Sequence, residues 1–134
     1  MHWYVYHSQK TMKRSYASLG MPAVYSTKSQ PKLCGGDTVW VIEGNTANPV
    51  QFELADCFRV SAAECGPFPG DLAGFKARAV GSSSLLSTAI PLSNTVIWFS
   101  ELHRRYITKQ KFFCSLGDEP EIVAGLLSSS AVRL

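Results

Sequence analysis

The 134-residue sequence lacks closely spaced cysteine pairs. Zinc sites usually take their ligands from such pairs, so the sequence predicts no metal site and no bound cofactor. Cysteine is also among the residue types most often found in protein cores. We therefore predict four reduced thiols that are mostly buried, at Cys34, Cys57, Cys65 and Cys114.

Long apolar runs are also missing, and none approaches the ~20 residues that a membrane helix needs. The first residues, MHWYVYHS, lack the basic start and leucine-rich centre of a signal peptide. These absences predict a cytoplasmic protein that does not engage a membrane. The length and the 46% hydrophobic composition predict a single domain over residues 1–134.

Acidic residues are absent from residues 1–36, although the formal net charge of the whole chain is only +3. A second basic cluster lies in residues 103–111. If the two segments meet in space, they can bind phosphate groups; the alternative is that they are solvated side chains on unrelated faces. The candidate phosphate-binding residues are Lys10, Lys13, Arg14, Arg104, Arg105 and Lys109.

The clearest structural pattern lies in residues 35–60. The sequence GGD at 35–37 is typical of a turn, and TVWVIE at 38–43 is rich in β-branched and aromatic residues. Residues 50–60 alternate, with Val50, Phe52, Leu54, Phe58 and Val60 on one face. A period of two indicates a half-buried strand, so these segments predict a long hairpin at the centre of a sheet.

Further elements follow from shorter patterns in the chain. Strands are predicted at 2–7, 22–27, 75–80 and 111–116, and a helix at 94–107. Residues 11–19 fit a short helix or a loop, residues 29–32 a turn and residues 61–65 a helical turn. A last helix is expected to begin at Asp118, with a cap that pairs this residue with Glu121. The fold class is therefore α+β, a small curled antiparallel or mixed sheet of five or six strands, or an open barrel, with two or three peripheral helices.

The order of these parts resembles the PUA-like superfamily, especially its EVE and YTH branches. The aromatic strand at 2–5, the GD-x-V turn and strand at 36–40 and the returning strand at 52–60 carry the resemblance. It implies an open barrel that reads nucleic acid or a modified base. In such a reader, one base is flipped out of its stack into an aromatic pocket.

Such a pocket needs aromatic faces for stacking and polar atoms to read the base edge. Asp56 is a candidate for the second role because it interrupts the apolar face of an otherwise regular strand. Two alternatives stay open: the tryptophans form the core, and a β-bulge turns Asp56 outward. The candidate pocket residues are Trp3, Tyr25, Trp40, Asp56 and Trp98.

We therefore predict a non-catalytic binding domain whose partner is DNA or RNA. The alternative is a protein-interaction domain that binds a protein partner through an exposed aromatic face. A cysteine-dependent enzyme would have to assemble Cys57 or Cys65 with a histidine and Asp56 across the fold. No local motif indicates such an assembly.

Overall fold

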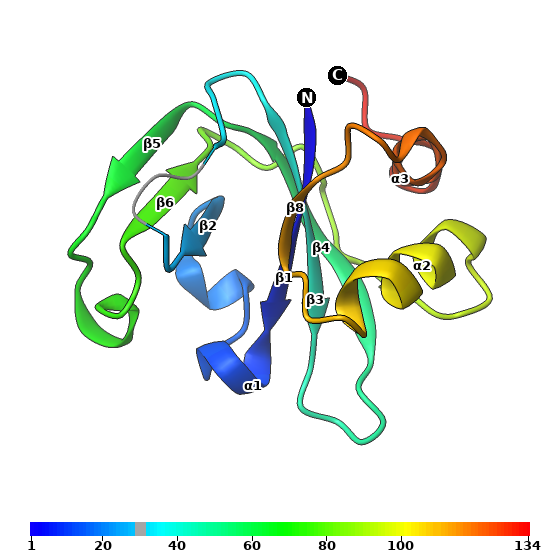
Figure 1. Ribbon diagram of the computed structural model, residues 1–134, viewed down its shortest axis with the longest axis horizontal. Helices are drawn as coiled ribbons and strands as arrows, with labels where there is room; N and C mark the ends of the chain where they lie inside the picture. The colour runs from blue at the N-terminus through cyan, green and yellow to red at the C-terminus, as the bar shows by residue number, and fades with distance from the viewer. Residues whose placement is uncertain (29–31) are drawn as a thin grey trace.

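A computed structural model describes residues 1–28 and 32–134, so residues 29–31 of the predicted turn lie outside its scope. The described chain forms eight strands in two sheets, together with short and longer helices (Figure 1). The larger sheet has the order β7-β4-β3-β1-β8. Its strands are β1 (His2–Ser8), β3 (Thr38–Gly44), β4 (Phe52–Arg59), β7 (Ile90–Leu92) and β8 (Phe113–Ser115).

The smaller sheet has the order β2-β6-β5, with all neighbours antiparallel. Its strands are β2 (Ala23–Ser26), β5 (Ala62–Cys65) and β6 (Ala77–Val80). In the larger sheet, β1 and β3 are parallel and the other neighbours are antiparallel. The helical elements are α1 (Gln9–Met12), η1 (Ala17–Leu19), η2 (Gly70–Leu72), α2 (Ile97–Leu102), η3 (His103–Ile107) and α3 (Pro120–Ser130).

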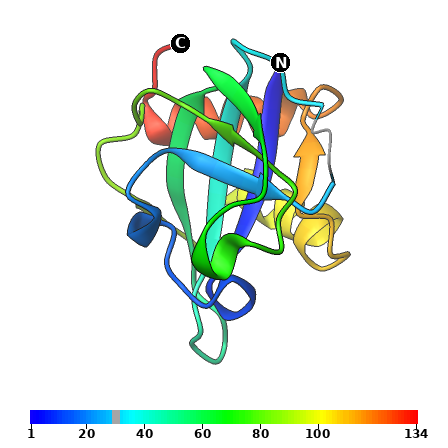
Figure 2. The same cartoon turned by 90° about the vertical axis from the view of Figure 1, so that its left-hand side faces the viewer.

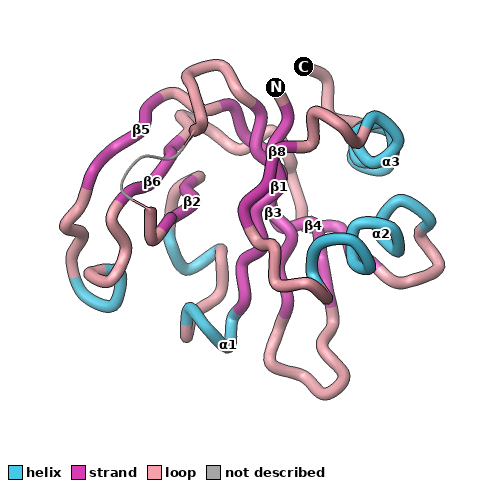
Figure 3. The backbone as a smooth tube through the Cα atoms, viewed as in Figure 1, coloured by secondary structure: helices cyan, strands magenta, loops and turns pink. Residues whose placement is uncertain are grey.

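The two sheets and the helices form layers with the larger sheet in the middle. Helices α2 and α3 cover one face of it, and the smaller sheet covers the other, with β2 crossing in front of the large-sheet strands (Figures 1 and 2). Figure 3 shows the same arrangement by type of structure. Each interface has its own hydrophobic core, which we call the helix-side core and the sheet-side core.

A β-bulge in β4 decides which residues enter each core. Val41 pairs with Asp56, whereas the next residue of β3, Ile42, pairs with Leu54, so Ala55 is an extra residue. The bulge reverses the alternation, which places Leu54 in the helix-side core and Phe58 in the sheet-side core. The expectation that even-numbered residues of this strand share one face was therefore wrong.

The α+β class is confirmed, and so is the position of the β3–β4 hairpin inside the larger sheet. The helix predicted at 94–107 is present as α2 followed by the π-helical η3. The sheets are two rather than one, and neither closes into a barrel. The curled sheet and the open barrel predicted from the sequence both assumed one continuous sheet. The sequence does not show which neighbouring strands fail to pair, so the division into two sheets was missed.

Two local predictions were wrong. Residues 62–65 form strand β5 rather than a helical turn, because they pair with β6. Helix α3 has Glu119 at its N-cap, with no side-chain capping bond, so Asp118 does not cap it. Pro120 takes the first helical position, where its missing N–H costs little.

Among the described residues, no helix is long and apolar enough to cross a membrane. All four cysteines are free thiols, but only Cys57 is buried, while Cys34 and Cys65 are exposed. The prediction of mostly buried thiols was therefore wrong. Within residues 1–28 and 32–134, no group of three or more potential ligands is placed to hold a metal ion.

Candidate functional site

Two of the predicted pocket residues belong to the helix-side core. Trp40 is fully buried, and its indole N–H donates to Nδ1 of His2 at 2.9 Å. Trp98 is also buried, and its indole N–H donates to the Ser129 hydroxyl at 2.8 Å. Both rings are therefore packing residues with satisfied hydrogen bonds, and neither presents a face to a ligand.

The other predicted pocket residues lie elsewhere. Trp3 packs against the sheet-side core and donates to Asp37 Oδ2 at 3.1 Å. Tyr25 lies on the outer face of the smaller sheet, where its hydroxyl accepts a hydrogen bond from Arg78 at 3.2 Å. The predicted aromatic pocket is thus divided among three places, and the structure does not bring its members together.

Asp56 points into the sheet-side core and is 3% exposed, so the bulge does not turn it outward. The Tyr16 hydroxyl donates to its Oδ2 at 2.6 Å, and the Cys57 amide donates to its Oδ1 at 2.8 Å. Burial raises the pKa of Asp56, although these hydrogen bonds oppose the rise. Because the Tyr16 oxygen also accepts from the Ala23 amide at 3.3 Å, this buried carboxylate holds the segment before β2 against β4.

The arginines predicted to bind phosphate are already paired with acids. Arg14 lies 3.2 Å from Asp71, and Arg104 lies 2.6 Å from Glu101. Arg105 pairs with both Glu101 and Glu119. Helix α1 and the segment formed by α2 and η3 also lie on opposite sides of the larger sheet (Figure 1). The basic residues at α1 and those of η3 therefore form separate groups rather than one rim.

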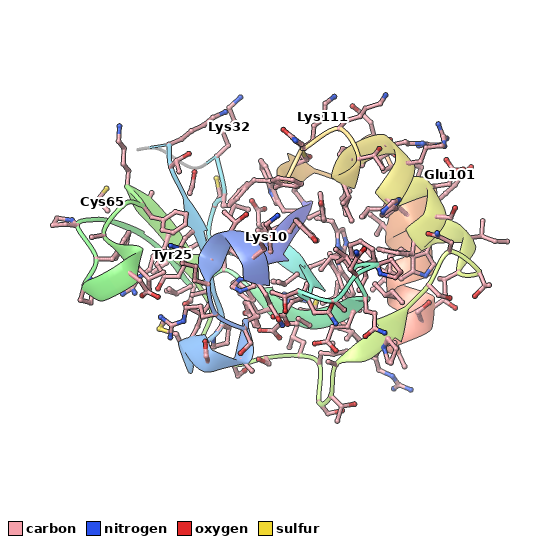
Figure 4. All side chains as sticks on the ribbon, turned by 90° about the horizontal axis from the view of Figure 1, so that it is seen from below. Lys10, Tyr25, Lys32, Cys65, Glu101 and Lys111 are labelled. Carbon is pink, nitrogen blue, oxygen red and sulfur yellow. The ribbon has the colours of Figure 1, made fainter. Side chains whose placement is uncertain are left out.

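The lysines differ from the arginines. Lys10, Lys13 and Lys109 are exposed, and no carboxylate of the described chain lies within the 4.0 Å limit of an ion pair. Lys10 extends from α1 in the view from below (Figure 4). The lysines without an ion pair that lie nearest the start of the chain are Lys10, within α1, and Lys13, at the end of that helix.

A cavity of about 710 Å³ opens where β3 and β4 enter their hairpin, and α1 and β7 complete its walls. This volume falls in the range of small-molecule sites. Its lining is rich in carboxylate and amide groups, and we call it the hairpin pocket. The lining residues are Gln9, Glu43, Asn45, Gln51, Phe52, Glu53, Pro91 and Leu92.

Two glutamates face each other in the hairpin pocket. Glu43 and Glu53 are directly opposite residues of β3 and β4, on the sheet face that bears α1. Glu43 is 4% exposed, and its Oε2 accepts hydrogen bonds from Gln9 Nε2 at 2.9 Å and from the Tyr16 amide at 2.8 Å. Burial, followed by repulsion from Glu43 and a hydrogen bond with it, raises the pKa of Glu53.

The amides of the hairpin pocket are fixed by the hairpin loop. Asn45 Oδ1 accepts from the Ala47 amide at 3.0 Å and from the Gln51 amide at 2.9 Å. Asn45 also donates through Nδ2 to Gln51 Oε1 at 3.2 Å. At Gly44, an added Cβ would collide with the hydroxyl of Tyr6, so any larger residue there would force the Tyr6 ring to move.

The pocket is built to accept hydrogen bonds rather than to stack on a ring. Phe52 lines part of the pocket, but its ring packs in the helix-side core. The centroid of the Phe52 ring lies 5.3 Å from that of Phe99 and 5.2 Å from that of His103. Carboxylate oxygens accept and never donate while ionised, so the pocket favours ligands that carry N–H groups or positive charge.

The sequence contained a signal for this pair that we did not use. Glu43 ends one strand, Glu53 lies near the start of the next, and each is five residues from Asn48 in the predicted loop. A regular hairpin places such residues opposite each other.

Cys57 offers little nucleophilic reactivity. Burial and the nearby charge of Asp56 raise the pKa of the Cys57 thiol to about 12. The thiolate, which is the nucleophile, is scarce at neutral pH for such a group. Cys65 lies on the exposed strand β5.

The glutamate pair leads to a testable prediction about stability. Folding raises the pKa of Glu53, so the folded protein holds this proton more firmly than the unfolded chain does. The stability that this proton contributes is fully present below the unfolded pKa, and it is lost as the pH rises through the folded pKa. The Glu53→Gln substitution removes the titrating group and its negative charge opposite Glu43, so this loss of stability does not occur in the variant. We expect it to raise the free energy of unfolding at pH 7 by about 0.2–1 kcal/mol, and to have no effect well below the ordinary pKa of 4.5.

Urea denaturation at several pH values measures this difference. Glu121→Gln is the matched control, because Glu121 is exposed in the first turn of α3, where its charge favours the helix. The control should lower the free energy of unfolding at neutral pH. A Glu53→Gln protein that loses stability as the control does would contradict the paired arrangement.

Comparison with known proteins adds no relative: no family model matches the sequence, and neither a curated protein nor a solved structure matches it significantly.

Proposed function

We propose that the protein is a cytoplasmic, non-catalytic binding domain that reads nucleic acid by taking one base into the hairpin pocket. The observation that carries the proposal is the facing pair Glu43 and Glu53, set in a cavity large enough for a base. Carboxylate and amide side chains are the groups that read the polar edge of an extruded base. The resemblance of the first 60 residues to PUA-like base readers supports the same function.

Phosphate contacts are assigned to α1 in this proposal. Gln9 lines the pocket, and Lys10 follows it in the same helix with no ion-pair partner among residues 1–28 and 32–134. Lys13 ends that helix and is also exposed. In this proposal, a nucleic-acid strand whose base enters the pocket passes α1, and the positive charge of that helix offsets the repulsion between phosphate and the glutamates.

Titration of short, labelled single-stranded oligonucleotides tests this function. We expect Glu53→Ala to weaken binding about tenfold or more, since a hydrogen bond to a charged group contributes about 1.5–3 kcal/mol. Glu64→Ala is the control, because Glu64 lies on the smaller sheet and pairs with Arg78. Equal losses in the two variants, or no binding tighter than about 100 μM at low salt, would refute the proposal.

The salt dependence of the same titrations locates the phosphate contacts. Lys10→Ala and Lys13→Ala should each flatten the salt slope by about 0.7, the value for one lost contact to a single strand. Arg104→Ala should leave the slope unchanged, because that side chain pairs with Glu101. Binding of a protein partner in place of oligonucleotides, with little salt dependence, would favour the interaction-domain alternative.

A further inference from the structure

The aromatic side chains on the helix side of the larger sheet form a row that begins at the hairpin pocket. Phe52 lines the pocket, and the centroid of its ring lies 6.2 Å from that of Tyr6. The Tyr6 centroid lies 5.1 Å from that of Phe112, with an angle of 37° between the two ring planes. Two ring-to-ring contacts therefore connect the pocket lining with Phe112.

Phe112 lies at the edge of the larger sheet, directly before β8. The Tyr6 amide donates to the Phe112 carbonyl at 2.8 Å, which extends the pairing of β1 with β8 by one residue. Within the described chain, β8 is the last strand at this edge, so no other strand covers the Phe112 ring. Phe112 is 39% exposed, whereas the next residue, Phe113, packs against the sheet-side core. The backbone pairing thus holds an aromatic ring at the surface.

Two lysines lie in the turn just before Phe112. Lys109 and Lys111 are both exposed, and their amides donate to the Tyr106 carbonyl at 3.2 and 2.9 Å, which fixes the turn. In the part of the chain that the structure describes, no carboxylate is close enough to either ammonium for an ion pair. Lys111 extends outward from the molecule (Figure 4). The exposed ring is therefore accompanied by positive charge that no ion pair neutralises.

We propose that Phe112, supported by Tyr6, stacks on a second base of the bound single strand, and that Lys109 and Lys111 contact the phosphates beside it. An aromatic face stacks on any base, and free ammonium groups attract a polyanion, so the two features together fit single-stranded nucleic acid. An apolar protein partner would use only the first of them. This inference rests on the proposed function, and it adds a neighbouring nucleotide to the one that enters the pocket.

Titration of labelled hexanucleotides of different base composition tests the stacking contact. Phe112→Ala is expected to weaken binding at least about fivefold for all of them alike, since stacking tolerates every base. Phe112→Trp keeps an aromatic face and should bind as tightly as the unmodified protein. Ile97→Ala is the control, because Ile97 is 82% exposed on α2 and lies outside the aromatic row, so its truncation should leave binding unchanged.

The salt dependence of the same titrations tests the phosphate contacts of the turn. Lys111→Ala should flatten the salt slope by about 0.7, the value for one lost contact to a single strand. Lys76→Ala removes the same charge from an exposed position directly before β6 in the smaller sheet, so it should leave the slope unchanged. Equal changes in the two variants would overturn the assignment of phosphate contacts to Lys111.

The outcomes separate this inference from the function on which it rests. If Phe112→Ala binds as tightly as the unmodified protein while Glu53→Ala does not, the stacking contact is overturned and base reading in the pocket stands. If Phe112→Ala weakens binding and Glu53→Ala does not, the stacking contact stands and base reading in the pocket is overturned. Binding of anionic lipid vesicles in place of oligonucleotides, or no binding of either, would overturn both.

Thermal unfolding checks that each variant is folded, and we expect transitions close to that of the unmodified protein. Phe112→Leu is the second variant for this purpose, because it keeps an apolar side chain of similar size at the surface. It should lose affinity as Phe112→Ala does, since leucine has no ring to stack on a base. Full binding by the folded Phe112→Leu protein would overturn the stacking contact.

Discussion

Replacing Phe58 by alanine is expected to lower the free energy of unfolding by about 3–5 kcal/mol, the usual cost of removing a fully buried ring. Phe58 is 0% exposed in the sheet-side core. Its ring also packs against the backbone at Gly81, where an added Cβ would lie 2.6 Å from Cδ2. Backbone relaxes less readily than a side chain, so we expect the cavity to persist after truncation.

Chemical denaturation measures this loss, with Arg59→Ala as the control. Arg59 is the next residue of β4 and is exposed, so its truncation should change the free energy of unfolding by no more than about 0.5 kcal/mol. Similar losses in both variants would mean that the bulge at Ala55 is misplaced and that the register after it is shifted.

Trp40→Ala is expected to cost a similar ~3–5 kcal/mol, because the ring is fully buried in the helix-side core. The change also removes the N–H that donates to His2. Trp40→Phe keeps much of the ring volume and should cost clearly less. Thermal and chemical unfolding of the two variants give the comparison.

The same two variants separate a packing role from a ligand-binding role. If Trp40 is a core residue, the folded fraction of Trp40→Phe should bind oligonucleotides with unchanged affinity and base preference. If the Trp40→Ala protein is as stable as the unmodified protein but has lost its preference among bases, Trp40 lines a ligand pocket, as the sequence analysis predicted.

The sequence predicted strand β4 and left a bulge at Asp56 open as one of two alternatives. The bulge is present, but it keeps Asp56 buried instead of turning it outward. Alternation over 50–60 indicated a strand, and Asp56 was noticed because it fell on the apolar face. That acidic residue fits a bulge and an inward carboxylate equally well, and the alternation has a period of two on either side of Ala55, so the sequence did not decide between them. The register shift across the bulge puts Leu54 in the helix-side core and Phe58 in the sheet-side core, which strict alternation along β4 would not allow.

The functional site was predicted in the wrong place for a related reason. Aromatic residues suit a core and a pocket equally, and only the layering of α2 and α3 over the larger sheet buries Trp40 and Trp98. The ion pair of Arg14 with Asp71 joins distant segments, so the sequence could not show it. Glu101, in contrast, lies three and four residues before Arg104 and Arg105 in the predicted helix, and this spacing was a signal that we did not use. Facing residues in a hairpin, in contrast, follow from sequence once the loop is placed.

An amide chemical-shift titration with a short single-stranded oligonucleotide shows whether a ligand binds at the hairpin pocket. We expect the largest shifts at the backbone amides of the pocket residues Gln9, Asn45, Gln51 and Glu53, and small shifts along α2. Shifts centred on Arg104 and Arg105 instead, with the pocket amides unmoved, would contradict it.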